Sequence, residues 1–217
     1  FDTESFANYN ASGLHSADTL FAAIDLKYFS APTLTKTWFH QGPVGEESGE
    51  WEEQDYTGEY WSGDPQLLKH TEAVNTFLHT LPQRRIKRDA LRTLRGSMLR
   101  SELYALDGSP LDDRPYTVTE HAYGLREEQS QNNSSRERIF FPHGTAQRTT
   151  QWERGDDPLT QFSFTGPYDA YGQPVSQSAF AMPRRSSKRV SHSGTAVADD
   201  VSVLATHTRT VYAEPGT

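Results

Sequence analysis

The sequence predicts a mainly β fold with one or two short helices, and three observations lead to this prediction. Short runs in which apolar and polar residues alternate recur along the chain, and turn residues separate them. Only 34% of the residues are hydrophobic, and the mean hydropathy is −0.76, which suits thin twisted sheets better than a helical bundle. The 4 Trp, 10 Tyr and 11 Phe argue against a disordered chain. An α+β arrangement is the alternative.

The first part of the chain gives the weakest pattern. Residues 1–33 carry aromatic side chains without a clear period, so we predict only short strand or loop there. Residues 34–40 alternate as a strand does, and the Gly and Pro residues of 41–45 predict a turn. The acidic stretch 46–59 predicts a surface loop held in place by its aromatic residues.

Two helices are expected near 65–96. Asp64 followed by Pro65 is typical of a helix start, because Asp caps the first turn and Pro needs no N–H there. Apolar residues then recur at helical spacing: Leu67, Leu68, Val74, Phe77, Leu78 and Leu81. A second short helix is predicted from Ile86 to Leu94, and Gly96 is expected to end it.

After Gly96 the apolar period changes to two. Strands are predicted at 97–106 and 116–126, with a turn at 107–110, and the polar segment 127–135 predicts a mobile loop. The remaining predicted strands are 138–143, 146–154, 160–166, 175–182 and 206–212. The Ser/Ala-rich stretch 186–200 predicts disorder or a missing neighbour. We therefore divide the chain into residues 1–33, 34–185 and 186–217.

Length and composition exclude several classes of protein. A chain of 217 residues fits one domain or one piece of a larger β structure, and since it begins with Phe1 we expect a fragment of a longer protein. The absence of Cys excludes disulfides and thiolate chemistry and is typical of folding in a reducing cytoplasm. A formal charge of −8 argues against nucleic acid as a partner, and no apolar run predicts a membrane span.

No motif predicts catalysis, a cofactor or a metal. Acidic residues cluster at 46–59, but a glycosidase needs two carboxylates at a set separation, and clustered acids in a loop are usually solvated. The eight His lack metal-ligand spacing, and the serines lack a nucleophile elbow. Positive charges are dense at Arg84, Arg85, Lys87, Arg88, Arg92, Arg95 and Arg100. We interpret them as a solvated helix face paired with the acidic stretch; the alternative is a site for an anion or an acidic protein.

Several stretches, in a shared order, resemble one family. They are residues 35–40, 89–108, 114–120, 152–158, 168–172 and 183–185. Together they resemble the B component of bacterial insecticidal toxin complexes (Tc toxins), in the region between its β-propeller and its Rhs/YD repeats. The resemblance covers about residues 34–185. The residues that we single out as its structural motif are Trp38, Phe39, His40, Arg95, Gly96, Glu102, Tyr104, Asp107, Gly108, Tyr116, Glu120, Asp157, Pro158, Asp169 and Gly172.

This resemblance implies a structural role without catalytic residues. It implies that the B and C components form a hollow Rhs-type β-sheet shell around a toxic C-terminal polypeptide. It also implies that other parts of the B component dock on a pentameric A component, and that the complex is secreted. The sequence departs from the family in its Ser/Ala-rich segment after residue 185 and in an apparent insertion at 131–135.

Two other functions stay open from the residues alone. A carbohydrate-binding β-module would present an exposed, coplanar row of Trp38, Trp51, Tyr60 and Trp61. A glycoside hydrolase would present a cleft with paired carboxylates. Aromatic side chains packed inward would favour the shell. A shell segment cut from its neighbours would expose strand edges, so we also expect the isolated chain to be marginally stable or to self-associate.

Overall fold

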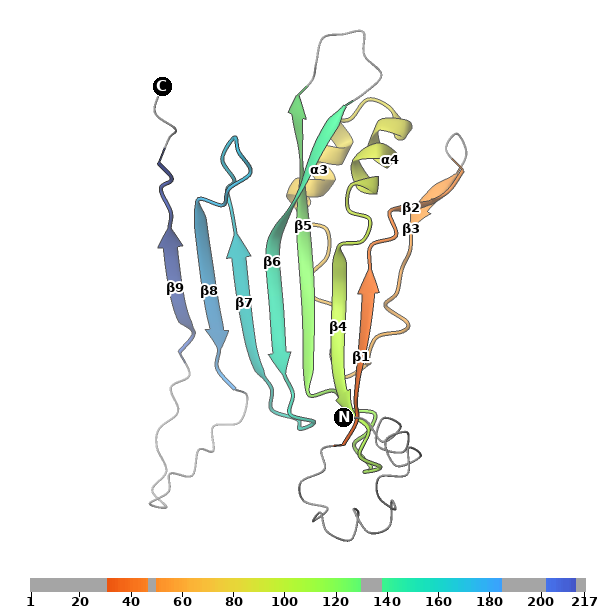
Figure 1. The fold of residues 1–217 in the computed structure, drawn as a ribbon, viewed down its shortest axis with the longest axis vertical. Coiled ribbons are helices and arrows are strands. Elements are labelled where there is room, and N and C mark those ends of the chain that lie inside the picture. Colours follow the sequence, from red (N-terminus) through yellow and green to blue (C-terminus); the bar gives the residue numbers. More distant parts are fainter. Residues whose placement is uncertain (1–30, 47–49, 130–137, 185–201, 214–217) are drawn as a thin grey trace, which may run out of the picture.

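A seven-stranded antiparallel sheet dominates the computed structural model, which describes residues 31–46, 50–129, 138–184 and 202–213 (Figure 1). The mainly β prediction is therefore confirmed. No helix in these ranges is both long and apolar enough to cross a membrane. In spatial order the strands are β1 (Thr33–Phe39), β4 (Met98–Ala105), β5 (Thr117–Gln129), β6 (Ile139–Gln151), β7 (Leu159–Thr165), β8 (Ser176–Met182) and β9 (Leu204–Arg209).

A small hairpin of β2 (Pro43–Gly45) and β3 (Trp51–Glu53) follows β1. The predicted turn at 41–45 and the predicted loop at 46–59 are thus wrong where these strands form. Gly45 makes the hairpin possible: its φ is +130°, and a Cβ there would lie 2.3 Å from the carbonyl oxygen of Glu50. A side chain could not fit at this approach of the two strands.

Both helices form, but the first begins later than predicted. Helix α3 spans Glu72–Thr80, and its N-cap is Thr71, whose side chain accepts a hydrogen bond from the Val74 N–H. Asp64 caps no helix, because its carboxylate is buried against distant residues described below. Helix α4 spans Arg84–Arg92. It ends before Gly96, whose N–H instead donates to the His40 carbonyl in the strand region after β1.

The remaining strands follow the prediction closely, with one exception. The segments predicted as 138–143 and 146–154 form the single strand β6, because the extra residue Thr145 is absorbed as a bulge between Gly144 and Ala146. Strand β5 extends into the predicted loop, as far as Gln129. Strand β9 begins two residues before the predicted 206 and ends at Arg209, three residues before the predicted 212. The predictions for residues 1–30, 130–137 and 186–200 lie outside the described residues.

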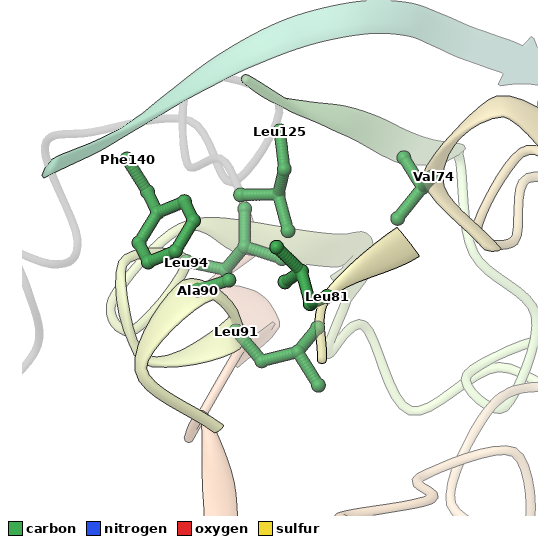
Figure 2. Packing of buried hydrophobic residues seen from close by; sticks show 7 residues of the cluster. All are labelled: Val74, Leu81, Ala90, Leu91, Leu94, Leu125 and Phe140. Atoms are coloured by element: carbon green, nitrogen blue, oxygen red, sulfur yellow. The ribbon is translucent and has the colours of Figure 1, made fainter. Parts of the chain in front are cut away.

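The apolar core lies where the two helices meet one end of β5 and β6 (Figure 2). Leu125 and Phe140 project from these strands toward the helices, and each is at most 8% exposed. The helical side of the core consists of Val74, Leu81, Ala90, Leu91 and Leu94. Burial of this cluster accounts for the helical spacing of apolar residues in the sequence.

The two faces of the sheet differ, and the strand pairing identifies them, because directly paired residues share a face. The covered face contains the row Trp38, Arg100, Glu120, Arg148, Phe162, Phe180 and Ala205. The open face contains the adjacent row Thr37, Ser101, Thr119, Thr149, Gln161, Ala181 and Leu204. The first four residues of the covered row are buried, whereas no member of the open row is buried.

Candidate functional site

Five charged side chains are buried at the centre of the covered face: Asp64, Arg100, Glu102, Glu120 and Arg148, each at most 3% exposed. Arg100 Nε lies 2.7 Å from Glu102 Oε1, and Arg100 Nη1 lies 2.6 Å from Glu120 Oε1. Arg148 Nη2 bridges Asp64 at 2.5 Å and Glu120 at 3.1 Å. Buried charges are costly unless they are paired and hydrogen-bonded. Each charge of this ion-pair network is therefore stabilised by its partners in the network.

The network holds a connecting segment, residues 54–70, against the sheet. Glu102 Oε1 accepts a hydrogen bond from the Trp61 N–H at 3.0 Å. Glu120 Oε2 accepts from the N–H groups of Leu67 and Leu68 at 3.1 and 3.2 Å. Arg100 Nη2 donates to the Asp64 carbonyl at 2.8 Å. The buried charges thus bind main-chain N–H and C=O groups of an irregular segment. These groups need such partners because the segment forms no helix or strand in which they would bond to one another.

Aromatic side chains complete the network as neutral donors. The Tyr104 hydroxyl donates to Glu102 Oε2 at 2.5 Å, and Trp152 Nε1 donates to Asp64 Oδ2 at 2.7 Å. Burial, together with the hydrogen bond to Glu102, raises the pKa of Tyr104. Burial raises the pKa of Tyr60, whose ring lies under the Arg100 guanidinium, to about 12. Both phenols therefore keep their protons at neutral pH, and Tyr104 uses its proton to donate to Glu102.

A second cluster ties two turns together at the other end of β4. Arg154 Nη1 lies 2.6 Å from Asp107 Oδ2, and its guanidinium stacks over the Tyr116 ring at 5.4 Å. The Gly108 N–H donates to Asp112 Oδ2 at 3.0 Å within the same turn. The hydrogen bonds from Arg154 lower the pKa of Asp107. The cluster fixes the turn after β4 against the turn after β6.

A third cluster shapes the turn between β7 and β8. Asp169 Oδ1 accepts hydrogen bonds from the N–H groups of Tyr171 and Gln173 at 2.9 and 2.8 Å. Gly172 has a φ of +78°, and a Cβ there would lie 2.9 Å from the Phe141 ring. Arg126 Nη1 donates to the Asp169 carbonyl at 3.0 Å. The turn is thus attached to the ends of β5 and β6.

A polar pocket of about 280 Å³ lies between the hairpin, the connecting segment and β5. His70 Nε2 lies 3.0 Å from Glu53 Oε2, and the rings of His40 and His70 are 5.9 Å apart. The hydrogen bond that His70 donates to the Glu53 carboxylate raises the pKa of His70. Burial lowers the pKa of His40 to about 4, so this imidazole is neutral at physiological pH.

Comparison with known proteins decides the family. Residues 89–209, over half of the chain, match the family described as the insecticide toxin TcdB middle/C-terminal region. The chain belongs to this toxin family. The resemblance noted in the sequence is thereby confirmed. No curated protein sequence matches the chain significantly.

Solved structures of Tc toxin complexes share the fold of this TcdB-family chain. It is similar to a crystal structure of TcdB2–TccC3–Cdc42, with 27% identity over 75% of this chain and a TM-score of 0.57. A crystal structure of TcdB2–TccC3–TEV gives 26% identity over 76% and a TM-score of 0.58. A structure of the Photorhabdus luminescens Tc holotoxin pore gives 27% identity over 73% of this chain and a TM-score of 0.54. The match spans 8%, 8% and 7% of those chains, so this chain corresponds to a small part of each.

The structure distributes the motif residues of this TcdB-family chain over separate clusters. Glu102, Tyr104 and Glu120 belong to the buried network, and Trp38 borders it by its contact with Tyr60, whose ring lies under Arg100. The turn clusters contain Asp107, Gly108, Tyr116, Asp169 and Gly172. His40 lines the polar pocket and bonds to Gly96. Phe39 and Arg95 are exposed, Asp157 is half-buried and Pro158 is buried, and we find no shared site for these four.

Sequence analysis missed the basic half of the network. Arg100 was assigned to a solvated helix face, which is wrong, because it is buried on β4. The predicted pairing of the basic helix with the acidic stretch 46–59 is found for Arg84, whose Nη2 lies 2.8 Å from Glu50 Oε2. Alternation could have revealed Arg100 and Arg148, since each shares a strand face with a residue two positions away that is also buried: Glu102 and Thr150. A charge at an inward position of a strand predicts a buried partner.

The aromatic residues proposed as a sugar platform do not form a coplanar row. Trp38 is 9% exposed and meets Tyr60 edge-to-face at 5.0 Å. Trp61 meets Trp152 at an interplanar angle of 81°. Trp51 lies under the Arg84 guanidinium. This inward packing is the arrangement that the sequence analysis associated with a shell and not with sugar binding.

Proposed function

We propose that this chain is a non-catalytic wall segment of a Tc toxin B component. In this proposal it forms part of a hollow Rhs-type shell that the B and C components build around a toxic polypeptide. The observation that carries the proposal is a seven-stranded sheet in which, within the described residues, β1 and β9 each have only one neighbour. Such a sheet is built to continue on both sides.

The edges of the sheet support continuation. Every residue of β9 is exposed, and β1 is exposed over most of its length. An open edge pairs readily with another strand, and proteins that leave an edge free usually protect it with Pro, inward charges or bulges. Strand β9 has the sequence LATHTR, in which Arg209 at the last position is the one such charge. An edge of this kind fits a partner strand from elsewhere in the parent protein.

The state of the buried carboxylates supports a structural role and not a catalytic one. Both oxygens of Glu102 and both oxygens of Glu120 accept hydrogen bonds or ion pairs from the network. A general acid or base has to reach the substrate proton, whereas these two residues are at most 1% exposed. Their position fits a clamp that keeps the wall rigid.

The partners follow from the similar structures by analogy. TcdB2 occurs together with TccC3 in the similar crystal structures. We therefore assign a C component and its enclosed polypeptide as the partners of this segment, and a pentameric A component as a partner of other parts of the parent protein. The proposal includes a secreted complex, no contact of this segment with membrane and, given a net charge of −8, none with nucleic acid.

Electron microscopy of the full-length parent protein, expressed together with its C component, tests the proposal. The expected result is a hollow, closed particle in which this sheet can be fitted into the wall. A compact solid domain that carries an open aromatic cleft would overturn the proposal and favour the carbohydrate-binding alternative.

A further inference from the structure

Helix α4 is strongly basic, and its charges stand where they oppose helix formation. Arg84 and Arg85 occupy its first turn, which has no acidic residue, and its N-cap Gln83 makes no side-chain hydrogen bond. The N-terminus of a helix has a partial positive charge that disfavours cations. Arg84, Arg88 and Arg92 also follow one another at a spacing of four residues, which brings like charges together on the helix surface.

Helix α3 of the same chain follows the rules that α4 breaks. Its N-cap Thr71 accepts a hydrogen bond from the Val74 N–H, and Glu72 provides an acidic group in its first turn. The two helices have the same length and contribute to the same apolar core. The unfavourable charges are therefore specific to α4 and do not follow from the packing of the helices. Local features that lower stability are expected at functional sites.

The described residues neutralise this positive charge only in part. The basic surface of α4 consists of Arg84, Arg85, Lys87, Arg88, Arg92 and Arg95. Arg84 Nη2 lies 2.8 Å from Glu50 Oε2, but the Glu50 side chain is 93% exposed. Arg92 Nη1 lies 4.0 Å from Asp89 Oδ1. The side chain of Arg95 has no ion pair within the part of the chain that the structure describes.

The part of the basic surface that lacks close partners lies beside the β2–β3 hairpin (Figure 1). A Cβ at Gly42 would lie 3.4 Å from Arg92 Cα and 3.8 Å from Arg95 Cβ. Arg88 Nη2 donates to the Gly45 carbonyl of this hairpin at 3.4 Å, while Arg88 Nε is buried without a partner among the described residues. Arg92 and Arg95 are exposed. The hairpin thus borders the basic surface and leaves these two side chains open to solvent.

We infer that the basic surface binds an acidic polypeptide segment, which provides carboxylates to its guanidinium groups. Five of the six basic residues are Arg, whose planar guanidinium can form two parallel hydrogen bonds to a carboxylate. The contact between Arg84 and Glu50 shows this chemistry within the chain. Because Glu50 is so exposed, a carboxylate of the partner can replace it. This inference does not depend on the proposed shell.

The charge of the whole chain favours an acidic polypeptide segment over nucleic acid or an anionic membrane. The formal charge is −8, so the chain repels a large polyanion at long range. A short acidic segment places its charges at the basic surface alone and avoids most of this repulsion. Arg92 and Arg95 are then the residues that gain the most new partners, because they are exposed in the free chain.

Peptide binding to the complete parent protein, in complex with its C component, tests this inference. The probe is a fluorescein-labelled polyglutamate peptide, and fluorescence anisotropy at low salt measures its binding. Arg92→Gln with Arg95→Gln is expected to weaken binding roughly fivefold, because each exposed ion pair contributes little on its own. Lys36→Gln with Arg209→Gln is the matched control, since it removes the same charge at exposed residues of β1 and β9. This control should change binding by less than about twofold.

Three results would overturn the inference. The first is the absence of polyglutamate binding at low salt. The second is an equal affinity of the Arg92→Gln/Arg95→Gln variant and either the unchanged complex or the control. The third is stronger binding, through the same two arginines, of a single-stranded oligonucleotide or of vesicles that contain anionic lipid. This third result would assign the surface to phosphate groups.

A single substitution separates the cost of the basic residues from their use. Lys87→Glu places an acidic side chain near the N-terminus of α4, where a negative charge favours the helix. Amide exchange within Arg84–Arg92 should therefore become slower, while polyglutamate binding becomes weaker. Unchanged peptide binding would overturn the inference for this residue, whatever the change in amide exchange.

Discussion

At the residue scale, the buried network has three carboxylates but only two guanidinium groups. Neutral donors make up the difference: Tyr104, Trp152 and three main-chain N–H groups of the connecting segment. Replacing a whole buried network by apolar residues can be neutral, but removing one partner leaves another charge unpaired. The cost of a substitution here therefore depends on what remains, and Arg100 is paired with both buried glutamates.

We predict that Arg100→Met strongly destabilises the attachment of the connecting segment. The substitution leaves Glu102 without a guanidinium partner and Glu120 with Arg148 alone, at a cost of about 3–5 kcal/mol. Hydrogen exchange of the amides at Trp61, Leu67 and Leu68 in the full-length protein measures this cost. Arg84→Met is the control, since Arg84 and Glu50 are exposed and a surface pair contributes under about 1 kcal/mol. Equal protection in the two variants would contradict the prediction.

The polar pocket predicts a pH dependence with a defined sign. Burial lowers the pKa of His40 from 6.5 to about 4, because the folded protein favours the neutral imidazole. The contribution of this neutral imidazole to the free energy of unfolding is present above pH 6.5 and is lost as the pH falls toward 4. The full loss is on the order of 3 kcal/mol. The raised pKa of His70 acts in the opposite sense, because its contribution is present below pH 6.5 and is lost as the pH rises through the higher folded value.

We therefore expect His40→Gln to reduce the loss of stability between about pH 7 and about pH 5. Thermal melts of the parent protein and hydrogen exchange at β4 and β5 at the two pH values provide the measurement. Gln41→Ala, a change at the adjacent exposed residue, should leave the pH dependence as it is. If His40→Gln loses as much stability as the unchanged protein on acidification, the buried imidazole is not the cause.

At the element scale, local patterns predicted strands well and elements with distant partners poorly. Strands β1, β4, β7 and β8 lie within about two residues of their predicted ends, because alternation and turn residues are local signals. The start of α3 was misplaced because Asp64 has the local chemistry of a cap, while its carboxylate binds Arg148, 84 residues away. Of the network, the resemblance singled out Glu102, Tyr104 and Glu120, whereas Arg100 was assigned to a helix and Arg148 was not singled out, although both stand at inward positions of their strands.

The corrected start of α3 is testable with two substitutions. Thr71→Ala removes the side-chain oxygen that accepts from the Val74 N–H and should cost about 0.5–2 kcal/mol of helix stability. Thr71→Ser retains that oxygen and should retain most of the stability. Amide exchange within Glu72–Thr80 reports the difference. If both variants behave alike, Thr71 does not cap the helix.

At the scale of the whole molecule, the sheet is wide, and the connecting segment covers only part of one face. The helices pack at one end of β5 and β6, while β7 to β9 have none of the described elements over them (Figure 1). A sheet of this form gains its rigidity from the central network, and its two edge strands are open to neighbours. It fits the proposed wall segment.

We predict that the isolated chain self-associates through its edge strands. Thr206→Lys with Thr208→Lys places charges on β9 and should reduce association, because edge charges oppose strand addition. Light scattering after size-exclusion chromatography measures the mass of the species. The matched control, Gln161→Lys with Ser163→Lys, adds the same charge on the interior strand β7 and should reduce association less. A clean monomer of the unchanged chain with a cooperative melt would contradict the prediction.

The way in which the network holds the connecting segment affects how this protein can diverge. Glu102 and Glu120 bind peptide N–H groups of Trp61, Leu67 and Leu68, and every amino acid except proline supplies such a group. Natural variants can therefore exchange the side chains at 67 and 68 freely while the attachment persists, and proline is the one residue that selection should exclude there. The segment can drift in sequence while its path across the sheet stays the same.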